Sequence, residues 1–76
     1  MELIDFVKNF ASQFEETDLN VFLPETHFKN LSEWSSITAL SIIAMVDEEY
    51  GIAIRGNDIH NAETIEDLFK TVQAKK

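Results

Sequence analysis

Residues 36–50 are marked as a helix at both ends. The hydroxyls of Ser35 and Ser36 can accept hydrogen bonds from the free amides of a first helical turn, and Gly51 can adopt the left-handed backbone that often ends a helix. The residues between these two marks are largely apolar. We therefore predict a helix over Ser36–Tyr50.

Two other segments carry apolar residues at helical spacing. The segment Glu2–Glu16 predicts an amphipathic helix whose apolar face holds Leu3, Ile4, Val7, Phe10, Ala11 and Phe14. The last predicted helix begins at Thr64, has acidic residues in its first turn, and presents on one face Ile65, Leu68, Phe69 and Val72.

The connection between the second and the last helix predicts one further helical turn. Ile52–Arg55 alternates apolar and other residues but is too short for an independent strand. Gly56 to Asp58 offers a turn and a helix cap, so a short helix is expected around Asp58–Asn61. The predicted fold class is all-α: a bundle of three longer helices and one short helix, in a single domain over residues 1–76.

Residues 17–35 are a long connection for so small a chain. This segment holds the only Pro and several isolated apolar residues, namely Val21, Phe22, Leu23, Phe28, Leu31 and Trp34. We expect a packed loop rather than a linker, with a helical turn near Asp18–Phe22. Trp34 is expected to anchor the loop beside the second helix.

Charge and composition exclude several classes of function. Fourteen acidic and six basic residues give a net charge of −8, which repels nucleic acid and anionic membranes and favours partners with basic patches. The chain has no Cys, no basic leader-like start and no apolar run of membrane-spanning length. We expect a cytoplasmic, monomeric protein that binds neither membrane nor nucleic acid.

The predicted second helix has more apolar surface than one buried face requires. One stripe comprises Ala39, Ile43, Val46 and Tyr50, with Ile42 at its edge. A second stripe comprises Ile37, Leu40 and Ala44, and it runs from Ser36 toward Glu48. Either the second stripe is a docking surface, or the helix is buried on all sides.

The acidic run Asp47-Glu48-Glu49 stands at the predicted C-terminus of this helix, where negative charge opposes the helix dipole. Because residues 30–54 contain no Lys or Arg, this face is expected to present unneutralised charge to a basic partner.

No residue pattern predicts catalysis or metal binding. The sequence places no His and acid pair around Ser36, and His27 and His60 lack the spacing of metal ligands. We therefore expect a protein that is not an enzyme, and a Ser36 that receives a modification.

Three strings of the sequence match one family. They are Leu31-Ser32-Glu33-Trp34-Ser35-Ser36-Ile37, Asp47-Glu48-Glu49-Tyr50-Gly51-Ile52-Ala53-Ile54 and Thr64-Ile65-Glu66-Asp67-Leu68. With them the chain resembles an acyl carrier protein over essentially its whole length. In that family the motif is Asp-Ser-Leu, followed by a helix that ends in Glu-Glu-Phe-Gly-Ile. Ser36 aligns with the modified serine, while Ser35 replaces the Asp and Ile37 the Leu.

The resemblance implies a four-helix carrier with a covalent cofactor. A phosphopantetheinyl transferase would attach 4'-phosphopantetheine from coenzyme A to Ser36, and the adjacent Ser35 is a second, less favoured attachment point. The thiol of the arm would hold an acyl or aminoacyl group as a thioester. Acyl-loading and acyl-transferring enzymes of fatty-acid, polyketide, envelope or related biosynthesis would dock through basic patches on a face made of Ile37, Leu40, Ala44, Asp47 and Glu48.

The sequence departs from the family pattern at Ser35 and at Ser41, where the family often has acidic residues. A Ser caps a helix about as well as an Asp but carries no charge. These departures indicate a specialised transferase or partner set. They also leave two alternatives open: a degenerate, unmodified carrier fold that acts as an acidic protein-interaction module, and a purely structural helical domain.

Overall fold

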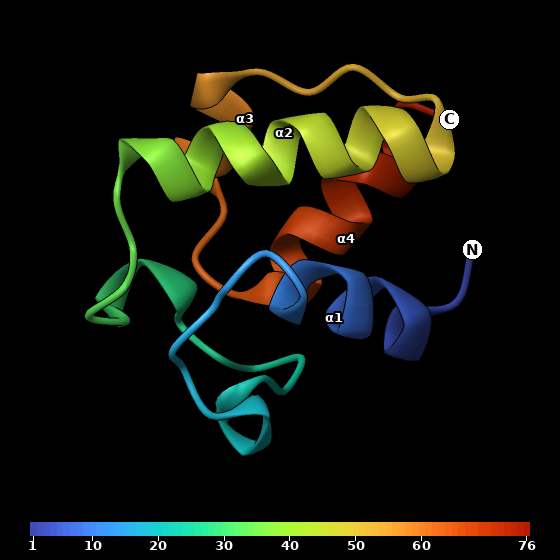
Figure 1. Ribbon diagram of the computed structural model, residues 1–76. Helices are drawn as coiled ribbons and strands as arrows, with labels where there is room; N and C mark the ends of the chain where they lie inside the picture. The colour runs from blue at the N-terminus through green and yellow to red at the C-terminus, as the bar shows by residue number, and fades with distance from the viewer.

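The chain folds into helices joined by loops and hydrogen-bonded turns, and it contains no strand. The computed structural model describes residues 1–76 and confirms the all-α prediction. The elements, drawn in Figure 1, are α1 (Leu3–Ala11), the 3-10 turns η1 (Leu19–Val21) and η2 (Phe28–Asn30), α2 (Ser36–Tyr50), α3 (Gly56–Asn61) and α4 (Ile65–Ala74). None of these helices combines the length and the apolar character needed to cross a bilayer.

The prediction for α2 is confirmed at both ends. The Ser35 side chain accepts a hydrogen bond from the Thr38 amide, which satisfies one of the free first-turn donors. Gly51 lies in the left-handed region at φ 65°, and its amide donates to the Asp47 carbonyl over 2.9 Å.

The prediction that the first helix reaches Glu16 is wrong, because α1 ends at Ala11. The amides of Gln13 and Phe14 bond three residues back, to Phe10 and Ala11, which tightens the chain into a turn. Phe14 still packs in the core, but it does so from this turn.

The buried face of α1 is also rotated from the predicted one. Phe6, which the predicted stripe leaves out, is completely buried, whereas Ile4 is 64% exposed. The Phe6 ring meets the ring of Phe69 on α4 edge-on at a centroid distance of 5.5 Å and lies 5.9 Å from that of Tyr50 on α2. Phe6 and Ile4 point to different sides of the helix, so burial of one exposes the other.

In α2 the centre of the buried face differs from the prediction. Ile42, predicted at the edge of the stripe, is completely buried together with Val46, and Met45 is 4% exposed. Ala39, Ile43 and Tyr50 are only half-buried. The buried face of α2 is therefore centred on Ile42 and Val46, and it is rotated around the helix axis from the predicted stripe.

Residues 17–35 form a packed loop, as predicted, and the Glu33 carboxylate joins this loop to the turn after α1. The Glu33 carboxylate accepts hydrogen bonds from the amides of Glu15, Glu16 and Thr17 and from the Thr17 hydroxyl, over 2.7 to 3.1 Å. The predicted turn near Asp18–Phe22 is confirmed as η1, while η2 was not predicted.

Trp34 anchors this loop through aromatic contacts. Its ring lies edge-on to Phe28 at 5.0 Å and stacked with Phe14 at 6.4 Å. The contacts join the residues just before α2 to the turn that follows α1.

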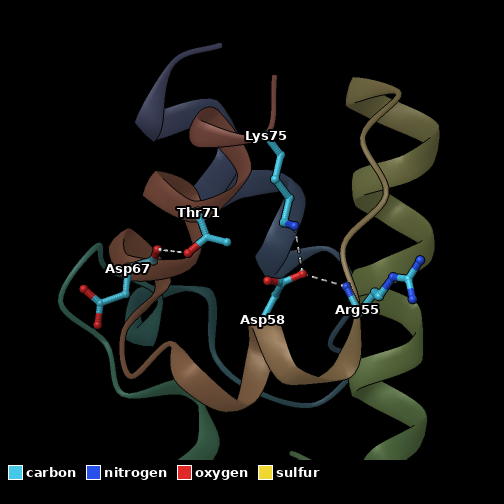
Figure 2. Close-up of polar contacts among 5 residues, drawn as sticks. All are labelled: Arg55, Asp58, Asp67, Thr71 and Lys75. Atoms are coloured by element: carbon cyan, nitrogen blue, oxygen red, sulfur yellow. Dashed lines mark hydrogen bonds and ion pairs between the residues drawn. The ribbon is translucent and has the colours of Figure 1, made fainter.

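The connection from α2 to α4 is fixed by buried side chains and by the Asp58 carboxylate. Ile52 and Ile54 are buried, and the helix predicted at Asp58–Asn61 starts earlier, at Gly56. Asp58 accepts the Arg55 amide over 2.9 Å and pairs with Lys75 at 3.5 Å (Figure 2).

Thr64, the predicted start of the last helix, is the N-cap of α4. Its hydroxyl accepts the Asp67 amide, and the Asp67 carboxylate accepts the amides of Glu63 and Thr64. These hydrogen bonds, that of Thr64 first, lower the pKa of Asp67. One turn later the Thr71 hydroxyl donates to the Asp67 carbonyl (Figure 2).

The Glu33 contact predicts a stability that depends on pH. The hydrogen bonds from the Thr17 hydroxyl and the amides of residues 15–17 hold the pKa of Glu33 below its ordinary value of 4.5. Because the folded state favours the ionised form, this contribution is fully present above that value and is lost as pH falls through the lower, folded pKa. Urea unfolding should show a midpoint that declines over this acidic range.

Glu33→Gln should lower the urea midpoint at pH 7, since an amide accepts fewer of these hydrogen bonds. It should also flatten the decline of the midpoint below about pH 5, because a Gln side chain does not titrate there. Glu25→Gln is the matched control, because the Glu25 side chain is exposed. Equal midpoints for the two variants would contradict the role given to Glu33.

Candidate functional site

Ser36 is the first residue of α2, and its side chain is exposed. Its hydroxyl takes part in none of the side-chain hydrogen bonds of the structure. The neighbouring Ser35 differs: its Oγ lies 3.3 Å from the Thr38 amide and 3.2 Å from the Thr38 hydroxyl. Of the two serines, only Ser36 offers an unoccupied hydroxyl to solvent.

The Ser35 hydroxyl belongs to a short chain of hydrogen bonds. Thr38 is buried, and its hydroxyl donates to the Glu33 carbonyl over 3.0 Å. Since the Thr38 hydrogen is used in that bond, the hydroxyl of Ser35 donates to Thr38 Oγ1 and accepts from the Thr38 amide. Removing or modifying Ser35 would break this chain, which also fixes the start of α2.

The surroundings of Ser36 suit a phosphate group. The first turn of α2 contains no acidic residue, and the N-terminus of a helix of 15 residues carries partial positive charge from its free amides. The residues present therefore fit a phosphodiester on Ser36. No histidine or carboxylate hydrogen-bonds to this hydroxyl, which is the contact that would activate a serine nucleophile within the chain.

The predicted second stripe of α2 lies in solvent. Ile37 is 77% exposed and Leu40 is 65% exposed, and Ala44 is exposed as well. The alternative that α2 is buried on all sides is therefore wrong. We call Ile37, Leu40 and Ala44 the α2 strip. It starts beside Ser36 and runs along the helix toward its acidic end.

The carboxylates of Asp47, Glu48 and Glu49 are exposed at the end of α2. The only ion pair of the structure joins Lys75 to Asp58, so none of these three charges is neutralised. Arg55, which stands nearest in sequence among the cations, is exposed and forms no ion pair. The acidic end of α2 is therefore free to attract a cationic surface.

Sequence reasoning missed the part that α1 and the turn after it add to this face. Asn9, Ser12 and Gln13 line a polar hollow of about 230 Å³ together with Glu48 and Glu49. Asn9 also donates to the Tyr50 hydroxyl over 2.8 Å, which holds the two helices together. The only signal in the sequence was the polar spacing of these residues along the first helix.

The two histidines lie outside this site. His60 is exposed, and its carbonyl accepts a hydrogen bond from Lys29 over 2.7 Å. His27 lines a different hollow with Lys29, Asn30 and Glu63. Nowhere do three His, Cys, Asp or Glu side chains come close enough together to hold a metal ion.

No protein-family model, curated protein or solved structure matches this chain. A functional assignment therefore rests on the sequence motifs and on the positions of their residues in the fold.

The hydrogen bonds of the two serines predict different effects on stability. Ser35→Ala removes the N-cap and should lower the free energy of unfolding by about 1 kcal/mol. Ser36→Ala removes a hydroxyl without a partner and should change it by less than about 0.5 kcal/mol. Urea unfolding of both variants, followed by circular dichroism, measures the difference; equal losses would show that the two serines share the capping role.

Proposed function

We propose that this protein is an acyl carrier, with 4'-phosphopantetheine attached to Ser36 and an acyl or aminoacyl group held as a thioester on the thiol of the arm. One observation carries the proposal: an exposed hydroxyl without a hydrogen bond begins a helix whose exposed apolar strip ends in unpaired carboxylates. The four-helix architecture and the three sequence strings that resemble acyl carrier proteins support it.

The chemistry of attachment needs little from this chain. Ser36 Oγ forms a bond to the phosphorus next to the pantetheine, the pyrophosphate bond of coenzyme A breaks, and adenosine 3',5'-bisphosphate leaves. The Ser36 proton passes to a base of the transferase, because this chain places no base on the hydroxyl. The positive end of α2 favours the phosphodiester product. The cofactor itself supplies the thiol that a chain without Cys lacks.

The choice of Ser36 over Ser35 follows from their hydrogen bonds. Modification of Ser35 would replace its hydroxyl proton, end its donation to Thr38 Oγ1 and disturb the start of α2. Modification of Ser36 breaks no hydrogen bond. A transferase can therefore modify Ser36 without unfolding the helix that presents it.

The α2 strip and the acidic end are proposed to dock partner enzymes. Exposed Ile37 and Leu40 would enter apolar pockets close to the modified serine, while Asp47 and Glu48 would steer basic patches toward the far end of the helix. A partner bound along α2 would thus have the thioester arm beside its apolar contacts.

The direct test is the intact mass after incubation with coenzyme A and a broad-specificity phosphopantetheinyl transferase. The parent protein should gain about 340 Da, the mass of the arm. Ser36→Ala should gain nothing, while Ser35→Ala and Ser32→Ala, which alter exposed serines nearby, should both keep the gain.

Ser35→Asp restores the Asp of the family motif and should increase the rate of modification by a general transferase, because it supplies the missing charge beside Ser36. No gain in mass for either the parent or Ser35→Asp would contradict the proposal and favour the unmodified interaction module.

The docking role predicts an effect of charge reversal. Asp47→Lys with Glu48→Lys should slow transferase loading about tenfold at low salt, with a smaller loss at high salt, because screening weakens the steering of basic partners. Glu25→Lys with Glu63→Lys makes the same change in net charge at exposed positions elsewhere and serves as the control. Equal rates for the two double variants would assign the effect to net charge alone.

A further inference from the structure

A second apolar surface lies on α1 and the first loop, on the other side of α1 from α2. Two adjoining hollows of about 530 and 420 Å³ share Ile4, Val7 and Phe22. Leu19 and Leu23 continue the lining along the loop. We call these five residues the α1 groove.

The α1 groove has a packed floor and an exposed rim. Val7 and Phe22 are 8% and 6% exposed and belong to the core. Ile4 and Leu19 are 64% and 69% exposed, and Leu23 is 49% exposed. Large aliphatic side chains gathered on both sides of a hollow mark an interaction surface more strongly than isolated exposed residues do. No part of the chain covers them.

The charges around the α1 groove indicate what could fill it. Lys8 is the one charged residue that lines the hollows. Four exposed carboxylates stand next to lining residues in the sequence, namely Glu2, Asp5, Asp18 and Glu25. None forms an ion pair, because the only pair joins Lys75 to Asp58. A complementary partner would bring apolar side chains to the groove and positive charge to its surroundings.

The same charges argue against other occupants. A second copy of this chain would bring a further net charge of −8 to an acidic surface, and an anionic membrane would also be repelled. An extended peptide that adds a strand needs a free sheet edge, and this all-helical fold has none. A helix with one apolar face fits a groove that runs between α1 and a loop.

We propose that the α1 groove binds an amphipathic helix of another protein, with apolar residues spaced i, i+3, i+4 and i+7 and with Lys or Arg beside them. Figure 1 shows η1 below α1 and α2 above α1, and no residue of α2 lines either hollow. A helix bound in the groove leaves Ser36 and the α2 strip uncovered. The proposal does not depend on attachment at Ser36.

The test uses a synthetic peptide made only of Leu and Lys, with the Leu residues on one helical face. Titration into the ¹⁵N-labelled protein should shift the amide signals of α1 and residues 19–25 more than those of α2. Binding should weaken as salt rises from about 50 to about 500 mM. A peptide of the same composition in scrambled order, and one with Glu in place of Lys, should bind at least about tenfold more weakly.

Two matched double variants locate the binding. Ile4→Ser with Leu19→Ser should reduce the affinity by about tenfold or more, since both side chains line the groove. Asn57→Ser with Gln73→Ser changes two exposed side chains outside both the groove and the α2 strip and should leave the affinity unchanged. All four positions are exposed, so both variants should keep the circular dichroism of the parent.

Several results would overturn the proposal. Among them are shifts centred on α2, unchanged affinity in the Ile4 and Leu19 variant, and equal binding of the Glu-containing peptide. Failure of the peptide to bind would also overturn it. So would self-association of the protein, or its binding to phosphatidylcholine vesicles, if the Ile4 and Leu19 variant abolishes that association in place of peptide binding. None of these results bears on the mass gain at Ser36.

Discussion

Glu33 connects two internal segments, the turn after α1 and the first turn of α2, which must meet for α2 to begin in its observed place. Its carboxylate takes the amides of residues 15–17, and its carbonyl takes the hydroxyl of buried Thr38. The turn after α1 and the first turn of α2 are thereby joined through a single residue. Trp34 adds aromatic contacts at the same junction. The position and solvent exposure of Ser36 follow from this junction.

The two adjacent serines differ in their hydrogen bonds. Ser35 faces the backbone of its own helix and supplies the cap, whereas Ser36 leaves its hydroxyl in solvent. A residue that another protein modifies must be reachable and yet held on a rigid element. A capped helix start meets both needs, and the α2 strip provides an apolar contact surface next to it.

The sequence was most informative about features that depend on residues adjacent in the chain, such as helix ends. The ends of α2 follow from the capping chemistry of Ser35 and Gly51, and both were located correctly. The end of α1 could not be read in this way, because apolar spacing continues to Phe14 while Glu33, far along the chain, binds the amides that follow. The burial of Phe6 in place of Ile4 depends on Phe69, which no local pattern specifies.

Some features of the candidate site likewise follow from local sequence, while others depend on contacts between distant residues. The apolar strip and the acidic end follow from the sequence pattern of α2, although the fold was needed to show that the strip is exposed and not buried. The distinction between Ser35 and Ser36 depends on the Thr38 and Glu33 contacts, which the sequence does not show. The polar contribution of α1 beside Glu48 likewise required the packing of two helices.

The α1 groove includes no residue of α2, and this separation from Ser36 has a kinetic consequence for the proposed carrier. A carrier held through the groove by one partner would keep Ser36 free to visit the enzymes nearby, and each transfer would become an encounter between tethered species. Tethering of this kind gives effective concentrations of about a millimolar, well above those of freely diffusing proteins. A domain of 76 residues could then serve successive reactions without dissociating between them.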